Sequence, residues 1–176
     1  EAEVKKELKR LVESSVELRL PSDVPFGTFL SGGIDSSLVS AIAQNIYGGK
    51  INTFSIGSEN LEYNEAHFPE NVANHINSSH HEFMVSDTDV KELVNDVVHH
   101  FDEPFADTSC LPTMMVSKLA KKYVTMTLSG DGGDELFHGY GFYNWANRLS
   151  NPCIKASRKV IGKALEFGDN RMKRAS

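Results

Sequence analysis

The chain alternates short runs of apolar and β-branched residues with longer segments in which apolar side chains recur every three or four positions. This alternation predicts βαβ units and therefore an α/β fold: a doubly wound parallel sheet of four to five strands with helices on both faces. In such sheets, ligands bind beyond the carboxyl ends of the strands. Strands are predicted at 26–30, 51–56, 82–85 and 124–128, and helices at 4–20, 38–46, 66–76, 88–99, 111–122 and 152–167.

Composition places the chain among globular proteins. It has 176 residues, of which 40% are hydrophobic and 24% charged, and its 13 Gly and 6 Pro are too few for a low-complexity chain. The 18 Lys+Arg and 24 Asp+Glu give a net charge of −6, with the excess of acid in residues 21–150 and an excess of base in 151–176. Because a nucleic-acid footprint needs a positive contact face, no nucleic-acid partner is expected.

Targeting signals and cysteine patterns are not apparent in the sequence. No apolar run approaches the roughly 18 residues of a membrane-spanning helix, and the N-terminal residues do not form the apolar region of a signal peptide. The two cysteines, Cys110 and Cys153, fit neither a metal-binding spacing nor a disulfide framework. We therefore expect no membrane partner and a cytoplasmic location.

The strongest motif is Phe29-Leu30-Ser31-Gly32-Gly33-Ile34-Asp35-Ser36-Ser37, between a predicted strand and a predicted helix. Its glycines leave backbone N–H groups unshielded, the start of the helix adds the positive end of a dipole, and the serines supply hydroxyl donors, so the turn can hold a phosphate. No lysine follows the glycines, and an aspartate within such a turn indicates charge neutralisation by Mg²⁺ at Asp35. The alternative is a plain turn that joins strand to helix.

A second glycine-rich turn, Ser129-Gly130-Asp131-Gly132-Gly133-Asp134-Glu135, follows the fourth predicted strand. Its three carboxylates repel one another unless a cation intervenes. Because both turns follow strands of a parallel sheet, they are expected at the same edge. The alternative is a solvated acidic turn at the start of the next helix.

Together these motifs resemble the N-type ATP pyrophosphatases and, within them, the synthetase domain of glutamine-hydrolysing asparagine synthetases. The likeness rests on Val24-Pro25-Phe26-Gly27, on the two glycine turns and on the loop from Asp102 to Ser109, and it runs from about Val4 to Tyr143. It implies a fold like that of the adenine nucleotide alpha-hydrolases. It also implies that residues 1–150 form the ATP-pyrophosphatase domain and that 151–176 form a C-terminal helix and basic tail of a truncated domain.

The resemblance implies a reaction in which ATP, with Mg²⁺, is cleaved between its α and β phosphates and AMP is transferred to a carboxylate. The first candidate is the aspartate side chain, and ammonia would then displace AMP to give asparagine. Ammonia would come from an N-terminal glutaminase domain that this chain lacks, so the chain alone is expected to turn over weakly or not at all. Alternatives are a related amidotransferase for another carboxylate such as a sugar acid, a tRNA- or nucleotide-modifying ligase, and a non-catalytic nucleotide-binding module.

The resemblance also assigns residues to roles. One departure from the family is His138-Gly139-Tyr140, in place of Gly-Gly-Tyr, which puts a side chain near the implied site. The histidine pairs His80-His81 and His99-His100 lack metal spacing and are expected to be structural or solvated. The implied catalytic residues are Asp35, Asp131 and Asp134; the ATP-binding residues are Phe29, Leu30, Ser31, Gly32, Gly33, Asp35, Ser36, Ser37, Ile56, Ser129 and Gly130; the substrate-binding residues are Asp131, Asp134 and Glu135; and the metal ligands are Asp35 and Asp134.

Overall fold

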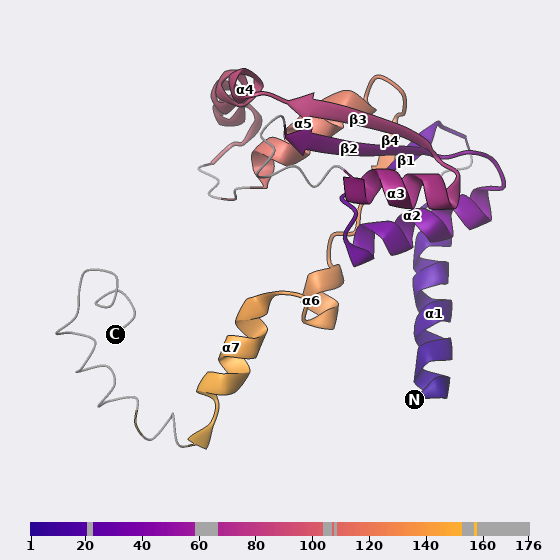
Figure 1. The fold of residues 1–176 in the computed structure, drawn as a ribbon, viewed down its shortest axis with the longest axis vertical. Coiled ribbons are helices and arrows are strands. Elements are labelled where there is room, and N and C mark those ends of the chain that lie inside the picture. The colour runs from indigo at the N-terminus through magenta and orange to yellow at the C-terminus, as the bar shows by residue number, and fades with distance from the viewer. Residues whose placement is uncertain (21–22, 59–66, 104–106, 108, 153–156, 158–176) are drawn as a thin grey trace. The chain divides into compact units, whose positions relative to one another are not determined.

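The computed structural model describes residues 1–20, 23–58, 67–103, 107, 109–152 and 157 (Figure 1). The chain divides into two compact units, Glu1–Asp131 and Gly132–Ser176, which are treated separately below. The elements in chain order are α1 (Ala2–Glu17), β1 (Phe26–Phe29), α2 (Ile34–Tyr47), β2 (Asn52–Ser58), α3 (His67–Ile76), β3 (Ser79–Val85), α4 (Asp87–His100), α5 (Cys110–Ala120), β4 (Met126–Leu128), α6 (Gly133–Phe137) and α7 (Gly141–Leu149).

The four strands of the described residues form one parallel sheet in the order β3-β2-β1-β4. Strand β1 is paired on both sides, with Thr28 opposite Thr53 of β2 and opposite Leu128 of β4. Because the strands run parallel, the turns that follow β1 and β4 leave the sheet at the same edge. The predicted parallel α/β sheet is confirmed, and β1 and β4 are neighbours within it.

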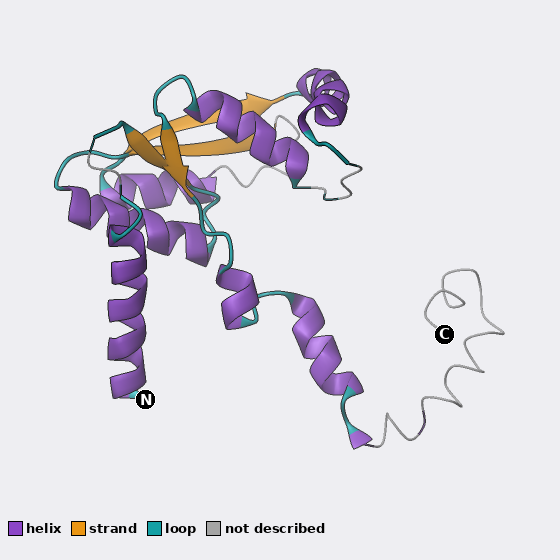
Figure 2. Cartoon of the chain, turned by 180° about the vertical axis from the view of Figure 1, so that it is seen from behind, coloured by secondary structure: helices purple, strands orange, loops and turns teal. Residues whose placement is uncertain are grey.

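Helices cover both faces of this sheet, as predicted (Figure 2). Helix α5 packs against β2 on one face and also contacts α4, whereas α2 and α3 contact each other and lie against β1 and β3. Each face has its own apolar core. The core on the α2 side consists of Val16, Phe26, Ile42, Ala43, Ile51 and Leu128, and the core on the α5 side consists of Phe54, Val116, Leu119, Ala120 and Val124.

Buried hydroxyl groups accompany the first of these cores. Thr28 and Ser40, both 0% exposed, share a hydrogen bond of 2.7 Å between β1 and α2. The ring of His80 on β3 joins two further hydroxyls of β2, with Thr53 Oγ1 2.9 Å from Nδ1 and Ser55 Oγ 3.2 Å from Nε2. These contacts satisfy the buried polar atoms. Burial, together with the neighbouring imidazole, lowers the pKa of His80 below its ordinary value.

The next histidine of the pair points to the opposite face of β3. His81 stacks on Phe54 with ring centroids 5.3 Å apart, contacts Tyr123 at 4.0 Å, and shares a 2.9 Å hydrogen bond between its Nε2 and Asn52 Oδ1. Both histidines are therefore structural, as the sequence indicates.

Strand β3 and helix α7 depart from the sequence prediction. Strand β3 begins at Ser79, three residues earlier than predicted, because its first side chains are polar and are held by hydroxyl and amide partners rather than by apolar ones. Helix α7 was not predicted, and none of its residues is buried in the structure. The predicted helix over 152–167 falls almost entirely outside the described residues. Among the described helices, none has the length and apolar content that crossing a bilayer requires.

Replacing Phe54 tests the core on the α5 side. Its side chain is 0% exposed, so Phe54→Ala leaves a cavity and should lower the free energy of unfolding by about 3–5 kcal/mol in urea titrations. Leu18→Ala, at a side chain that is 81% exposed, should change it by less than about 0.5 kcal/mol. Equal losses from the two substitutions would contradict this account of the core.

The half-buried His80 predicts a pH dependence of stability. Its native pKa is lowered, so the unfolded chain binds a proton that the native state resists, and stability should fall as the pH drops below about 6.5. His80→Gln should reduce the slope of unfolding free energy against pH between about pH 6.5 and 5. A remaining slope is expected from His81, whose pKa is also lowered by burial. An unchanged slope in His80→Gln would refute the assignment.

Candidate nucleotide site

The turn after β1 is closed by its own hydroxyl groups. Ser31 Oγ and Ser36 Oγ share a 2.9 Å hydrogen bond, the N–H of Ser31 donates to Ser36 Oγ at 3.2 Å, and the N–H of Gly33 donates to Ser31 Oγ at 3.3 Å. Gly33 is the N-cap of α2, and no side chain caps this helix. The first N–H groups of α2 are therefore available to an anion, which the positive end of the helix dipole also favours.

Two side chains in the first turns of α2 lack partners. The Asp35 carboxylate is half-buried and forms no hydrogen bond or ion pair in the part of the chain that the structure describes. Ser37 Oγ is buried, and none of the described residues hydrogen-bonds to it. An orphaned buried hydroxyl is costly, and a phosphate oxygen is a suitable partner for it. Both residues thus fit a phosphate site of the kind predicted.

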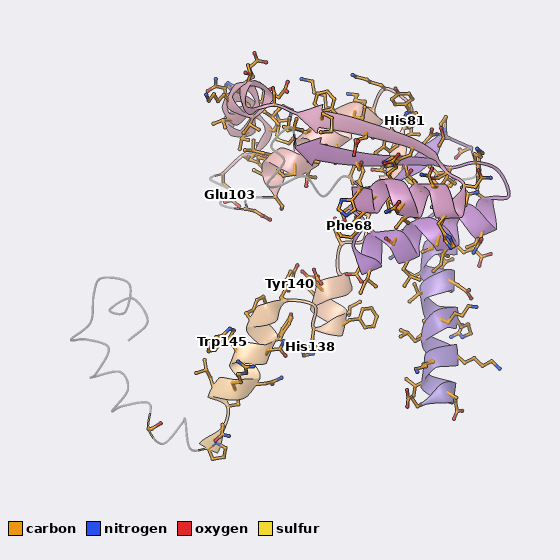
Figure 3. The ribbon with its side chains drawn as sticks, in the orientation of Figure 1. Phe68, His81, Glu103, His138, Tyr140 and Trp145 are labelled. Carbon is orange, nitrogen blue, oxygen red and sulfur yellow. The ribbon has the colours of Figure 1, made fainter. Side chains whose placement is uncertain are left out.

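The left-handed backbone at Gly32 brings the turn against the start of α3. Its φ is +80°, and a Cβ atom placed there would lie 2.6 Å from Phe68 Cβ and 2.9 Å from the nitrogen of Pro69. Phe68 stands at the start of α3 (Figure 3). Only glycine therefore fits, for reasons of both conformation and space. The sequence motif points to Gly32, but it carries no signal for Phe68 and Pro69, which belong to a different βα unit.

The turn after β4 lies on the other side of the start of α2. A Cβ atom on Gly130 would lie 2.8 Å from the backbone nitrogen of Ser36 and 3.1 Å from Asp35 Cβ. Beside it, the Ser129 hydroxyl donates to Asp131 Oδ2 at 2.8 Å. Gly130 therefore lies against the start of α2, so the first glycine turn and the segment Ser129-Gly130-Asp131 lie at one edge of the sheet.

The predicted apolar contacts of the nucleotide come from strand ends. Leu30 is 1% exposed, and its N–H donates to the Phe54 carbonyl at 2.8 Å, which ties the start of the turn to β2. Phe29 and Ile56 are half-buried and pack against the core on the α5 side. These residues hold the sheet edge in place, and their contact with an adenosine stays a prediction.

Asp134 and Glu135 belong to helix α6 in the second unit. The hydroxyl of Tyr140 donates to Glu135 Oε1 at 2.7 Å, and this bond lowers the pKa of Glu135 and raises the pKa of Tyr140 to about 12. Asp134 lies against Gly139, where a Cβ atom would approach its Cγ to 2.7 Å. Asp134 therefore packs against the backbone of Gly139, and the hydrogen bond from the Tyr140 phenol favours the charged form of Glu135.

His138 ends helix α6 in a left-handed conformation, with φ 58°. This conformation suits glycine and costs free energy for a residue with a Cβ atom. The His138 ring packs on Tyr143 with centroids 4.5 Å apart. The departure from the glycine of the family pattern thus adds an imidazole to an aromatic group beside Tyr140.

The acidic side chains near the glycine turns can be compared with the ligands that Mg²⁺ takes at phosphate sites. Within the described ranges, no three His, Cys, Asp or Glu side chains gather into a metal site. Mg²⁺ at phosphate sites takes only one or two carboxylates, with phosphate oxygens and waters completing its coordination. The unpartnered Asp35 beside the uncapped start of α2 fits that pattern.

Comparison with known proteins places the chain in a family. The family model described as asparagine synthase matches residues 7–174. The chain belongs to the asparagine synthase family. It is 44% identical over 133 residues to a putative glutamine-hydrolysing asparagine synthetase 2 of Methanocaldococcus jannaschii, covering 75% of this chain and 26% of that protein. It is 38% identical over 138 residues to glutamine-hydrolysing asparagine synthetase 1 of Bacillus subtilis, covering 78% and 22%.

The chain thus spans about a quarter of the length of these members of the family. Among solved structures, the NMN synthetase of Francisella tularensis has a similar fold, with a TM-score of 0.51 over 77% of this chain and 58% of the other. The two sequences are 18% identical, so this likeness concerns the fold.

Two glycines with positive φ allow the contact at Gly32 to be tested. Gly32→Ala and Gly48→Ala both place a Cβ in a left-handed conformation, which costs about 1–2 kcal/mol. Nothing lies within 4 Å of a Cβ on Gly48, whereas one on Gly32 meets α3. Gly32→Ala should therefore lose about 1–3 kcal/mol more in chemical denaturation. Equal losses would show that α3 does not restrict the turn.

Proposed function

We propose that the chain binds ATP together with Mg²⁺ at its two glycine turns and activates a carboxylate by adenylation for attack by ammonia. The observation that carries this proposal is the meeting of both turns at the start of α2, where uncapped helix N–H groups lie beside an unpartnered buried hydroxyl and an unpartnered carboxylate. Such donors favour a phosphate group over other ligands.

The aspartate side chain is the proposed acceptor, and asparagine, AMP and pyrophosphate are the proposed products. Support comes from membership of the asparagine synthase family and from the names of its relatives. Those names also support ammonia supplied by glutamine hydrolysis, which we assign to a separate glutaminase domain. For this chain we propose that residues 1–150 form the ATP-binding domain, with 151–176 as a C-terminal helix and basic tail.

The proposed reaction has two steps. First, an oxygen of the acceptor carboxylate attacks the α-phosphorus of ATP, the bond from that phosphorus to the oxygen bridging to the β-phosphate breaks, and pyrophosphate leaves with the electron pair. Next, the nitrogen of ammonia attacks the acyl carbon, the carbon–oxygen bond to AMP breaks, and the nitrogen loses a proton to solvent. Neither step needs a protein nucleophile, so positioning and charge stabilisation supply the catalysis.

We propose different residues for positioning the substrates and for stabilising charge. The N–H groups at the start of α2 and the hydroxyls of Ser31, Ser36 and Ser37 would hold the pyrophosphate end of ATP. Bound Mg²⁺ would neutralise phosphate charge, with Asp35 and Asp134 as its proposed carboxylates. Asp131, Asp134 and Glu135 are proposed on the acceptor side, where Tyr140 keeps Glu135 ionised.

A second acceptor class follows from one observation. His138 stands where the resembling family has glycine, and its ring adjoins Tyr143. A changed acceptor pocket would allow a different carboxylate, such as a sugar acid, while the ATP half of the reaction stays the same.

In a protein that carries this chain together with a glutaminase domain, the proposal predicts steady-state release of pyrophosphate from ATP and Mg²⁺ that depends on both aspartate and ammonium. Asp35→Ala should lower this rate by at least about 100-fold, because a charge-stabilising group is removed. Asp23→Ala, at an exposed acid ahead of β1, is the matched control and should keep the rate.

The assay separates the alternatives. Release that ignores aspartate but responds to another carboxylic acid would overturn the proposed acceptor and keep the mechanism. ATP binding without AMP formation in any protein that carries this chain would overturn the enzymatic proposal in favour of a nucleotide-binding module.

A further inference from the structure

The first turn of α3 lies outside the predicted motifs but contacts the glycine turn at Gly32. The backbone of Gly32 lies so close to it that a Cβ atom there would be 2.6 Å from Phe68 Cβ, 2.9 Å from the Pro69 nitrogen and 3.0 Å from the Phe68 carbonyl carbon. The contact therefore involves the backbone and Cβ of Phe68, whereas the ring extends outward. Phe68 is 50% exposed, and its ring lies against that of His67 in a tilted arrangement, with centroids 4.0 Å apart.

This turn of α3 is itself firmly held. Pro69 is buried, and Ala73, one turn further along, is 1% exposed where the helix packs against α2 and β3. Proline fixes its own φ, and at the third position of a helix its missing N–H costs no hydrogen bond. The start of α3 is therefore anchored by buried side chains at the place where it contacts the glycine turn.

The glycine turn needs such a surface. Glycine populates left-handed and right-handed conformations about equally, so Gly32 has no intrinsic preference for φ +80°. Hydrogen bonds close the turn: Ser31 Oγ and Ser36 Oγ share one of 2.9 Å, the Ser31 N–H donates to Ser36 Oγ at 3.2 Å, and the Gly33 N–H donates to Ser31 Oγ at 3.3 Å. None of these bonds involves an atom of Gly32 itself. Contact on the α3 side restricts the alternatives that the glycine would otherwise sample.

We propose that Phe68, with Pro69 behind it, is a positioning residue: its Cβ holds Gly32 in the left-handed conformation and so preorganises the turn for phosphate. The part of this inference that concerns phosphate rests on the proposed function. The effect on the conformation of Gly32 depends only on its contact with Phe68. Holding a turn in its binding conformation improves affinity, because less conformational entropy is lost on binding.

The test compares a substitution that keeps the Cβ atom of residue 68 with one that removes it. Phe68→Ala keeps Cβ and should leave the dissociation constant of Mg·ATP within about twofold of the parent chain. Phe68→Gly removes Cβ and should raise it about fivefold, equivalent to about 1 kcal/mol. Glu70→Gly is the matched control, since it loosens the same turn of α3 at an exposed side chain, and it should bind like Phe68→Ala.

A second readout does not depend on nucleotide. Amide hydrogen exchange followed by NMR without ligand should be about fivefold faster at Ser31 and Gly33 in Phe68→Gly than in Glu70→Gly, while amides of β2 remain unchanged. In a protein that carries this chain together with a glutaminase domain, Phe68→Gly should raise the KM for ATP with little change in kcat.

The outcomes are distinct. Equal exchange at Ser31 and Gly33 in Phe68→Gly and Glu70→Gly would overturn the positioning role, as would a loss of affinity in Phe68→Ala equal to that in Phe68→Gly. Faster exchange in Phe68→Gly in a chain that binds no Mg·ATP would uphold the positioning of the turn and overturn the proposed function instead.

Discussion

Close approach of three backbone segments at one edge of the sheet is the constraint on which the candidate site depends. The turn after β1 lies between the start of α3 and the turn after β4, and Gly32 and Gly130 remove the side chains that would separate them. Parallel pairing of β1 with both β2 and β4 brings these segments to a common edge. A substitution at either glycine would therefore move the ends of two elements, and the arrangement of donors would change with them.

The sheet supports this edge with different chemistry on its two faces. The α5 side is apolar and aromatic, whereas the α2 side combines an apolar cluster with buried hydroxyls and the imidazole of His80. The hydrogen bond between Thr28 and Ser40 is directional and orients α2 on the sheet. The two hydrogen bonds of His80 likewise orient β3 relative to β2. Helix α2 carries the uncapped N-terminus, so a precise position for this helix is also a precise position for the proposed phosphate donors.

Much of the fold, and the location of the candidate site, could be predicted from local sequence patterns. The alternation of strands and helices predicts the parallel sheet, and glycine turns after two strands predict where chemistry gathers. What the pattern could not give depends on tertiary contact. His80 and His81 lack the apolar alternation of a strand because they hydrogen-bond to polar side chains of β2. Phe68 belongs to no motif because it contacts Gly32 from a different βα unit. Helix α7 was missed although its sequence carries a signal for it, because Phe142, Trp145 and Leu149 recur at helical spacing.

The order of the strands has a consequence for how the chain reaches this structure. Strand β1 occupies an inner position, yet one of its neighbours, β4, pairs Met126 with Phe26 across nearly the whole folded unit. Closing so long a loop costs entropy before any pairing compensates for it, and parallel sheets of this kind fold slowly. The pairing of β1 with β4, and with it the approach of Gly130 to the start of α2, therefore requires nearly the whole unit to have been synthesised.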